Sequence, residues 1–237
     1  MTQAREARVV MISGAARGIG LGIARVLAER GWQLSLGVRD PRKLPGALAG
    51  KPHMAHRYEA LDAKSGQEWA EATGQRYGRI DAVVANAGII IRKTVVEATD
   101  DDVDQILDIN VKAPLRLARA AWPYLVKCGQ GRVVTIASLA AKRVPRSTSG
   151  LYSVSKFAAL GLSHAIRHAG WDAGIRAIAI CPGFVATDMT ASMTTQYPAE
   201  KMTQPEDIGR IVALALDLPN TTSISEIPVN CQLDPSY

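Results

Sequence analysis

The chain has 237 residues, a formal net charge of +6 and three cysteines. This length suits one α/β domain over residues 1–237 with a substantial core. We expect no membrane span and no secretory leader, because long apolar runs are absent and the segment 1–6 is polar. Dispersed basic residues argue against a nucleic acid partner, and the few, odd-numbered cysteines favour a reducing cytoplasm.

The first predicted unit is a strand, a glycine-rich turn and a helix. The apolar strand Val9–Ser13 leads into Gly14-Ala15-Ala16-Arg17-Gly18-Ile19-Gly20 and then a mainly apolar helix, Ile19–Arg30. In a dinucleotide-binding turn of this kind, Gly14 permits the tight turn, Gly18 lets the backbone approach the pyrophosphate, and Gly20 permits close helix–strand packing. The helix N-terminus offers free N–H groups to phosphate. We therefore expect a nucleotide here rather than an empty glycine turn.

The rest of the chain continues the strand–helix alternation. Further strands are expected at Gln33–Val38, His56–Ala60, Ala82–Asn86, Arg132–Ala137, Arg176–Cys181 and Ile224–Val229. Further helices are expected at Ser65–Tyr77, Asp100–Lys127 (with Thr99 as its cap), Leu151–Ala173 and Pro205–Leu216. This pattern predicts a single-domain, Rossmann-like, doubly wound sheet, mostly or wholly parallel, with about seven strands and helices on both faces. Ligands then bind beyond the carboxyl ends of the strands.

The segment containing Tyr152 and Lys156 carries the strongest chemical signal. On a helix these side chains lie one turn apart on the same face. An ammonium beside a phenol lowers the phenol pKa, so the tyrosine can exchange a proton with a carbonyl or alcohol near neutral pH. The spacing alone is common on solvated helices, but Ser138 also follows a predicted strand and stands at the same ligand edge.

Several further motifs occur in a fixed order. They are Gly14-x-x-x-Gly18-x-Gly20, Asn86-Ala87-Gly88, Asn110, Ser138, Tyr152-x-x-x-Lys156 and Pro182-Gly183. On these residues the chain resembles the short-chain dehydrogenase/reductase family over nearly its whole length. The resemblance implies an NAD(P)-dependent oxidoreductase, which transfers hydride reversibly between nicotinamide and a small ketone, aldehyde or secondary alcohol.

The resemblance also implies four catalytic roles. Ser138 would hold the substrate oxygen, and Tyr152 would act as general acid or base. Lys156 would lower the tyrosine pKa and bind the nicotinamide ribose. Asn110 would hold a water that links the lysine to solvent.

Cofactor-binding positions follow from the same resemblance. They are Gly14, Arg17, Gly18, Ile19, Gly20, Arg39, Asp62, Asn86, Gly88, Tyr152, Lys156, Pro182, Gly183, Val185 and Thr187. Asp62 corresponds to the residue that contacts adenine, and the segment from Pro182 to Thr187 to the turn that positions nicotinamide.

The end of the second predicted strand bears on the choice of cofactor. Val38 stands where NAD-preferring relatives carry an acid, and Arg39 follows it. A guanidinium can clamp the 2′-phosphate of NADP(H), with Arg17 on the other side of the pocket and Arg42 a weaker candidate. We therefore expect a preference for NADP(H). NAD(H) stays possible, because a shift of one position would make Asp40 the ribose ligand.

The substrate pocket is expected between residues 139–150 and a substrate loop or lid, 188–204. Met189 would contribute apolar surface, while Ser138 and Tyr152 hold the carbonyl. Arg143 or Arg146 would bind an anionic or polar substrate; the alternative is a solvated basic loop. No metal site is expected.

Assembly and activity leave alternatives open. The resemblance implies a homodimer or homotetramer, in which the helices Asp100–Lys127 and Leu151–Ala173 pair between copies. A catalytically silent NADP-binding regulator or scaffold of the same fold is the alternative to an enzyme. An NAD-preferring alcohol dehydrogenase, or a racemase, epimerase or dehydratase variant, is a further possibility.

Overall fold

Seven parallel strands form one sheet in the order β3-β2-β1-β4-β5-β6-β7. The strands are β1 Val9–Ser13, β2 Gln33–Val38, β3 Met54–Arg57, β4 Ala82–Ala85, β5 Arg132–Ile136, β6 Arg176–Pro182 and β7 Glu226–Val229. These elements come from a computed structural model that describes residues 7–191 and 197–233. The strand order reverses between β1 and β4, which makes the carboxyl edge there the switch point where such sheets bind ligands.

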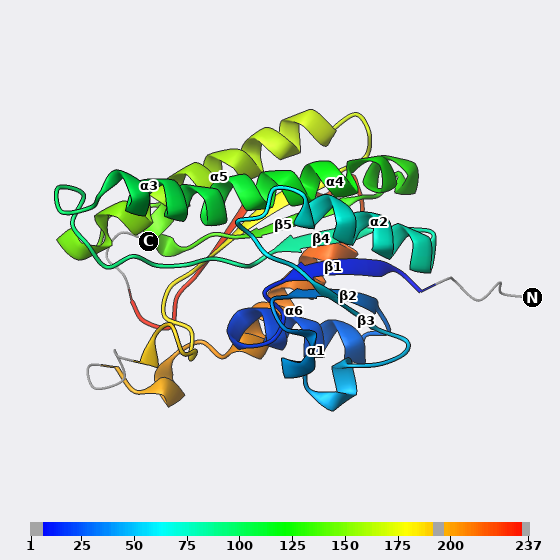
Figure 1. Cartoon of the computed structure of the whole chain (residues 1–237), viewed down its shortest axis with the longest axis horizontal. Helices are drawn as coiled ribbons and strands as arrows, with labels where there is room; N and C mark the ends of the chain where they lie inside the picture. The colour runs from blue at the N-terminus through cyan, green and yellow to red at the C-terminus, as the bar shows by residue number, and fades with distance from the viewer. Residues whose placement is uncertain (1–6, 192–196, 234–237) are drawn as a thin grey trace, which may run out of the picture.

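Helices cover both faces of this sheet, which confirms the predicted fold (Figure 1). Helices α1 (Gly18–Glu29) and α6 (Pro205–Asp217) pack against each other on one face. The opposite face carries α2 (Ser65–Tyr77), α4 (Ala113–Cys128) and α5 (Gly150–Gly170). A shorter helix, α3 (Asp100–Leu107), precedes α4 and packs against α5. Short 3-10 turns complete the described part: η1 Pro41–Lys43, η2 Gly46–Leu48, η4 Leu139–Ala141, η5 Ser147–Ser149 and η7 Ala199–Lys201.

The core consists of two layers because strand side chains alternate between faces. In β1, Val10 and Ile12 pack toward α1 and α6, while Met11 packs toward α2 and α4. All five residues of β1 are buried. A strand buried on both faces carries apolar side chains continuously, which explains the apolar runs in the sequence.

Two predicted elements differ from the structure. The third strand is Met54–Arg57 rather than His56–Ala60. It pairs with β2 alone at the sheet edge and is only partly buried, so burial barely marks its limits. The predicted helix Asp100–Lys127 is divided by a π-helical segment, η3 (Asp108–Lys112). Its predicted cap is confirmed: Thr99 and Asp102 form a capping box.

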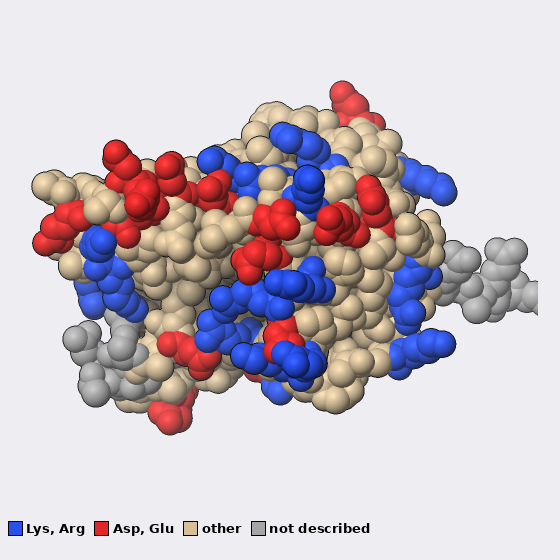
Figure 2. All heavy atoms as spheres, viewed as in Figure 1, with Lys and Arg blue, Asp and Glu red and all other residues tan. Residues whose placement is uncertain are grey.

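Within residues 7–191 and 197–233, no helix combines the length and the apolar character needed to cross a bilayer. On the face shown in Figure 2, acidic side chains gather over α3. Basic side chains gather over the start of α1 and the neighbouring η1, beside the switch point.

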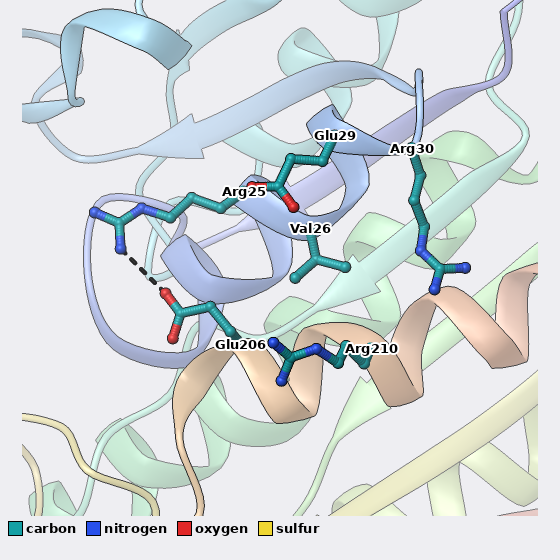
Figure 3. A pocket seen from close by; sticks show the side chains of 6 residues that line it. All are labelled: Arg25, Val26, Glu29, Arg30, Glu206 and Arg210. Atoms are coloured by element: carbon teal, nitrogen blue, oxygen red, sulfur yellow. Dashed lines mark hydrogen bonds and ion pairs between the residues drawn. The ribbon is translucent and has the colours of Figure 1, made fainter.

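Helices α1 and α6 approach closely through two glycines. A Cβ atom on Gly22 would lie 2.5 Å from the backbone carbon of Pro205, and one on Gly209 would lie 2.9 Å from the Gly22 carbonyl oxygen. Charged side chains border this contact, and Arg25 Nη1 pairs with Glu206 Oε1 at 3.1 Å (Figure 3). The position of α1, and hence of the glycine turn before it, depends on this backbone contact.

We expect Gly22→Ala to lower the free energy of unfolding by about 2–3 kcal/mol, because the new methyl group meets rigid backbone. Gly66→Ala is the matched control. Gly66 is also a buried helical glycine, but its nearest neighbour would be 3.8 Å from the new Cβ. Urea unfolding of both variants measures the difference, and equal stability of the two would contradict this reading of the helix contact.

Candidate active site

The glycine turn closes through a set of backbone contacts at the end of β1. Gly14 and Gly18 have φ values of +69° and +53°, which side-chain-bearing residues rarely adopt. A Cβ atom on Gly20 would lie 2.6 Å from Asn86 Nδ2. Asn86 Nδ2 in turn donates to the Ser13 carbonyl oxygen at 2.9 Å. Asn86, which directly follows β4, therefore connects the end of that strand to the glycine turn.

The N-terminus of α1 presents a site that fits a phosphate group. Its N-cap, Arg17, makes no capping bond from its side chain, and no acidic residue occupies the first turn. The N–H groups of the first turn, including that of Ile19, are therefore unopposed by a carboxylate. A Cβ atom on Gly18 would lie 3.3 Å from Thr187 Cγ2, so the turn after β6 closes over this end of the helix.

Arg17 itself contacts the segment that follows β6. Its Nη1 pairs with Asp188 Oδ2 at 3.0 Å, and both side chains are largely exposed, at 70% and 75%. The ion pair joins the glycine turn to the segment that follows β6. An exposed pair of this kind contributes little stability, so Arg17 can exchange Asp188 for a phosphate at small cost.

After β2, the two candidate cofactor ligands, Arg39 for a 2′-phosphate and Asp40 for a ribose hydroxyl, have different surroundings. Arg39 is exposed and has no carboxylate partner among the described residues. Asp40 caps η1 and accepts from the Arg42 backbone N–H at 3.1 Å and from its Nε at 2.9 Å. The Arg42 side chain lowers the pKa of Asp40. Asp40 is thus already engaged as a charged acceptor, whereas the guanidinium of Arg39 is available.

Asp62 lies in a turn rather than at a strand end. Strand β3 ends at Arg57, and Asp62 is exposed and accepts from the Lys64 N–H at 2.9 Å. Its carboxylate therefore organises the start of α2, and the structure does not bring it against the other site residues.

Four side chains at the carboxyl edge of β5 and β4 form a connected group. Ser138 follows β5, its hydroxyl donates to the Pro182 carbonyl oxygen at 3.3 Å, and it acts to lower the pKa of Tyr152. Lys156 Nζ lies 5.7 Å from the centroid of the Tyr152 ring and donates to the Ile136 carbonyl oxygen at 2.9 Å. A Cβ atom on Gly88 would lie 3.1 Å from Asn110 Oδ1 and 3.6 Å from Lys156 Nζ. The structure thus gathers all four predicted catalytic residues, with Gly88 between two of them.

Asn110 is buried at 2% exposure in the π-helical segment. Its Oδ1 accepts from the Ile89 N–H at 2.9 Å, and its Nδ2 donates to the Ile89 carbonyl oxygen at 3.0 Å. Nδ2 also donates to Ser155 Oγ at 2.9 Å. The π-helical turn, a common feature of functional sites, turns this amide toward the loop after β4.

Burial controls the protonation of the two central groups. Burial raises the pKa of Tyr152, and the side chain of Ser138 and the positive charge of Arg92 oppose this rise. Burial lowers the pKa of Lys156 to about 8. The predicted lowering of the Tyr152 pKa by Lys156 is not found: the pKa of Tyr152 is raised on balance, and Lys156 donates to the Ile136 carbonyl oxygen instead. Both shifts favour the uncharged forms.

The turn after β6 carries the remaining cofactor candidates. Pro182 ends β6, and Gly183 approaches Asn230 and Leu139 so closely that a Cβ atom would lie 2.9 Å from Asn230 Oδ1. Val185 is buried. Its carbonyl oxygen accepts from the hydroxyl groups of Thr187 and Thr190. These bonds fix a tight turn opposite the glycine turn.

The predicted substrate residues are only partly brought to this group. Arg146 is exposed at the start of η5, and Arg143 is partly buried. Met189 is 44% exposed. Part of the predicted loop 188–204, residues 192–196, lies outside the described residues.

Three residues of this region were not predicted from the sequence: Arg92, Ser155 and Ser13. Arg92 in particular stands in the segment directly after Asn86-Ala87-Gly88, and proximity to that motif was the signal available.

Known proteins support this assignment. A family model for short chain dehydrogenases matches residues 8–198. Agropine synthesis reductase of Rhizobium rhizogenes is 38% identical over 231 residues, covering 95% of this chain and 53% of that protein. The chain thus spans about half the length of that relative. Oxidoreductase UcpA of Salmonella typhimurium is 33% identical over 215 residues, covering 89% of this chain and 81% of that protein.

A solved structure agrees with this comparison. An alcohol dehydrogenase from Thermococcus sibiricus, complexed with 5-hydroxy-NADP, superimposes with a TM-score of 0.82 at 26% identity. The alignment covers 94% of this chain and 96% of that one. With its parallel sheet, its glycine turn and its grouped serine, tyrosine and lysine, the chain belongs to the short-chain dehydrogenase family.

Proposed function

We propose that this chain is a carbonyl reductase that prefers NADPH and acts on a small ketone or aldehyde. The observation that carries the proposal is the grouping of Ser138 and Tyr152 with the buried Lys156, whose Nζ lies 5.7 Å from the Tyr152 ring centroid. The cofactor and substrate sites then share one domain, 1–237, with 188–204 as the substrate loop. The reductase and oxidoreductase names of the relatives support the same class of reaction.

The residues present account for binding and proton transfer. Nicotinamide, when bound, supplies hydride to the carbonyl carbon. Because burial raises the pKa of Tyr152, its phenol is protonated at neutral pH and donates a proton to the carbonyl oxygen. Ser138 holds that oxygen through its hydroxyl. Lys156 binds the nicotinamide ribose, and Asn110 holds the loop and α5 around it and binds the water that links the lysine to solvent.

In this proposal the cofactor is recognised at the start of α1 and by residues that follow β2. The pyrophosphate fits the N–H groups at the start of α1, with Gly14, Gly18, Ile19 and Gly20 forming the turn. Arg39, which has no carboxylate partner among the residues the structure describes, supports binding of a 2′-phosphate. The engagement of Asp40 by Arg42 argues against that carboxylate as a ribose ligand. Arg17 would complete the phosphate site.

The opposite wall of this site comes from the turns after the strands. Asn86 and Gly88 lie beside the cofactor, while Pro182, Gly183, Val185 and Thr187 hold the nicotinamide. Asp62 would contact adenine. NAD(H) is the alternative cofactor.

Location and assembly are part of the same proposal. Cys128, Cys181 and Cys231 form no disulfide, which supports a reducing compartment such as the cytoplasm. Val154 and Phe157 leave apolar surface exposed on α5, which supports pairing of two or four copies through α4 and α5.

We expect Tyr152→Phe to reduce kcat/KM for NADPH-dependent carbonyl reduction at least 1,000-fold, on the order of the loss of a general acid. NADPH oxidation monitored by absorbance on a panel of carbonyl compounds measures it. NADPH binding should stay within about twofold of wild type, because the phenol oxygen alone is removed. Tight cofactor binding by wild type without turnover of any carbonyl compound would instead indicate the regulator or scaffold.

We expect Lys156→Met to raise the free energy of unfolding at pH 7 by about 1–2 kcal/mol while abolishing turnover. The folded state loses the Lys156 proton near pH 8 and the unfolded state near 10.5, so the cost of burying the charge is complete below pH 8. That cost disappears as the pH rises through 10.5, and the advantage of the variant should disappear with it.

Urea unfolding of wild type and variant at pH 7 and pH 10 tests this pH dependence. Lys201→Met, which changes an exposed lysine, is the control and should alter stability little at either pH. A variant that is less stable than wild type at pH 7 would refute the assigned cost of burial.

We expect Arg39→Gln to lower kcat/KM for NADPH at least tenfold and to change that for NADH less than twofold, because only NADPH carries the 2′-phosphate. Arg76→Gln, an exposed arginine in the last turn of α2, is the control. Steady-state kinetics with both cofactors decide it. If Arg39→Gln lowered kcat/KM for NADH more than that for NADPH, Asp40 would be the ribose ligand and NAD(H) the preferred cofactor.

A further inference from the structure

Arg92 connects the loop after β4 to the segment after β6, near the catalytic residues. It follows Gly88 by four residues, and Gly88 lies against Asn110 and Lys156. Its Nη2 donates to the Met189 carbonyl oxygen at 3.2 Å. The loop after β4 and the segment after β6 thus meet through this side chain.

The guanidinium has capacity left for a ligand. It is exposed, and its only hydrogen-bond acceptor among the described residues is an uncharged carbonyl group. No carboxylate of those residues pairs with it, whereas Arg17 on the cofactor side is paired with Asp188. An arginine offers five N–H donors in a planar fork, which suits a carboxylate.

Tyr152 lies within the electrostatic reach of Arg92. The positive charge of Arg92 contributes to lowering the pKa of this tyrosine against the effect of burial. A group bound by Arg92 would therefore lie within the range at which charge acts on this tyrosine. The other basic candidates lack this link: Arg146 is exposed at the start of η5, and Lys93 is already neutralised by Asp102 at 2.5 Å.

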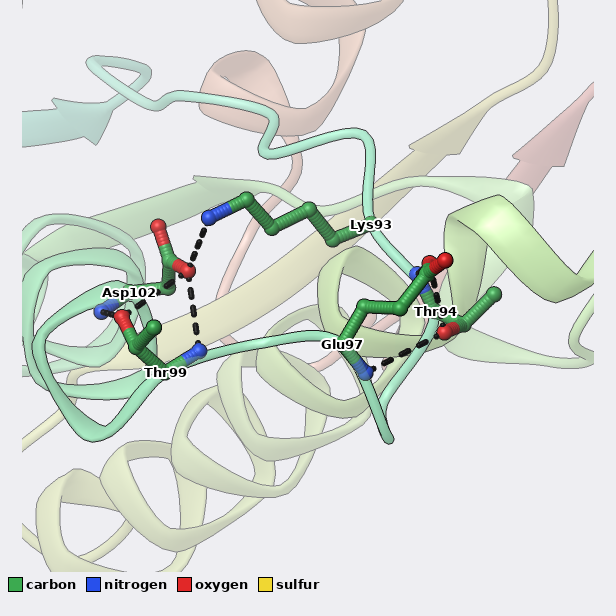
Figure 4. A network of polar contacts seen from close by, with 5 residues as sticks. All are labelled: Lys93, Thr94, Glu97, Thr99 and Asp102. Atoms are coloured by element: carbon green, nitrogen blue, oxygen red, sulfur yellow. Dashed lines mark hydrogen bonds and ion pairs between the residues drawn. The ribbon is translucent and has the colours of Figure 1, made fainter.

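The loop that carries Arg92 is fixed by a polar network (Figure 4). Lys93 pairs with Asp102, whose Oδ2 also accepts from the Thr99 N–H at 2.9 Å. Thr94 Oγ1 donates to Glu97 Oε2 at 2.7 Å. The hydrogen bond from Lys93 lowers the pKa of Asp102 to about 2, so the carboxylate is charged at neutral pH. The backbone of Arg92 is therefore held in place.

We propose that Arg92 binds a carboxylate of the substrate, so that the carbonyl compounds reduced at Tyr152 are oxo acids. This inference rests on the proposed reductase function. Neither Arg143 nor Arg146 then has to serve as the anion site. Because Arg92 also holds Met189, the bound carboxylate and the edge of the pocket share one side chain.

The test compares Arg92→Gln with wild type on acids and their uncharged esters. Suitable pairs are 2-oxo-4-phenylbutyrate and 4-oxopentanoate, each with its ethyl ester and with NADPH. We expect kcat/KM for at least one acid to fall at least 20-fold, while the ethyl esters change less than threefold. Arg76→Gln, at an exposed arginine in the last turn of α2, is the matched control and should leave kcat/KM for the acids and for the esters unchanged. If Arg92→Gln lowered kcat/KM equally for acids and esters, or for neither acid, Arg92 would not be the carboxylate-binding residue and would have a structural role at most.

A binding measurement separates this inference from the proposed function. Calorimetric titration of 2-oxo-4-phenylbutyrate and of 4-oxopentanoate into the protein–NADP⁺ complex should give, for at least one acid, a Kd at least tenfold weaker in Arg92→Gln. If wild type reduces no carbonyl compound, the reductase proposal fails, but this titration still decides the role of Arg92. Equal Kd values for wild type and variant with both acids would refute it.

Discussion

The buried amide of Asn110 is the contact on which the geometry of this site depends. It binds both backbone groups of Ile89 and the hydroxyl of Ser155. Ser155 Oγ in turn donates to the Tyr152 carbonyl oxygen at 2.7 Å. One buried side chain therefore joins the loop after β4 to α5, and its bond to Ser155 is made in the interior. Buried polar networks that are fully satisfied fix a single arrangement, because a partial arrangement leaves costly unpaired groups.

The π-helical turn makes this contact possible, and the sequence contains its cause. Pro114 has no N–H group, so it cannot donate to the carbonyl of Asn110 four residues earlier, as a regular helix would require. The helical ladder is interrupted at that point, and the wider turn of η3 places the amide against Ile89. A break that would merely weaken a surface helix here orients a buried side chain.

The parts of the structure that sequence reasoning predicted are those set by local patterns. The glycine turn, the strand–helix alternation and the spacing of Tyr152 and Lys156 each depend on neighbours within a few residues. Arg92 was not predicted because its contact, Met189, is 97 positions away and depends on the sheet topology. The limits of β3 were wrong because a partly buried edge strand shows weak periodicity. The division at η3 was missed although Pro114 marked it.

The charges around Tyr152 also bear on the direction of the reaction. Burial favours the protonated phenol, whereas the positive charge of Arg92 favours the phenolate. A carboxylate bound by Arg92 would cancel that charge and so raise the pKa of Tyr152 further, which keeps the phenol protonated for carbonyl reduction. Binding of an oxo acid would thus favour proton donation by Tyr152, an effect that a neutral ketone would not have.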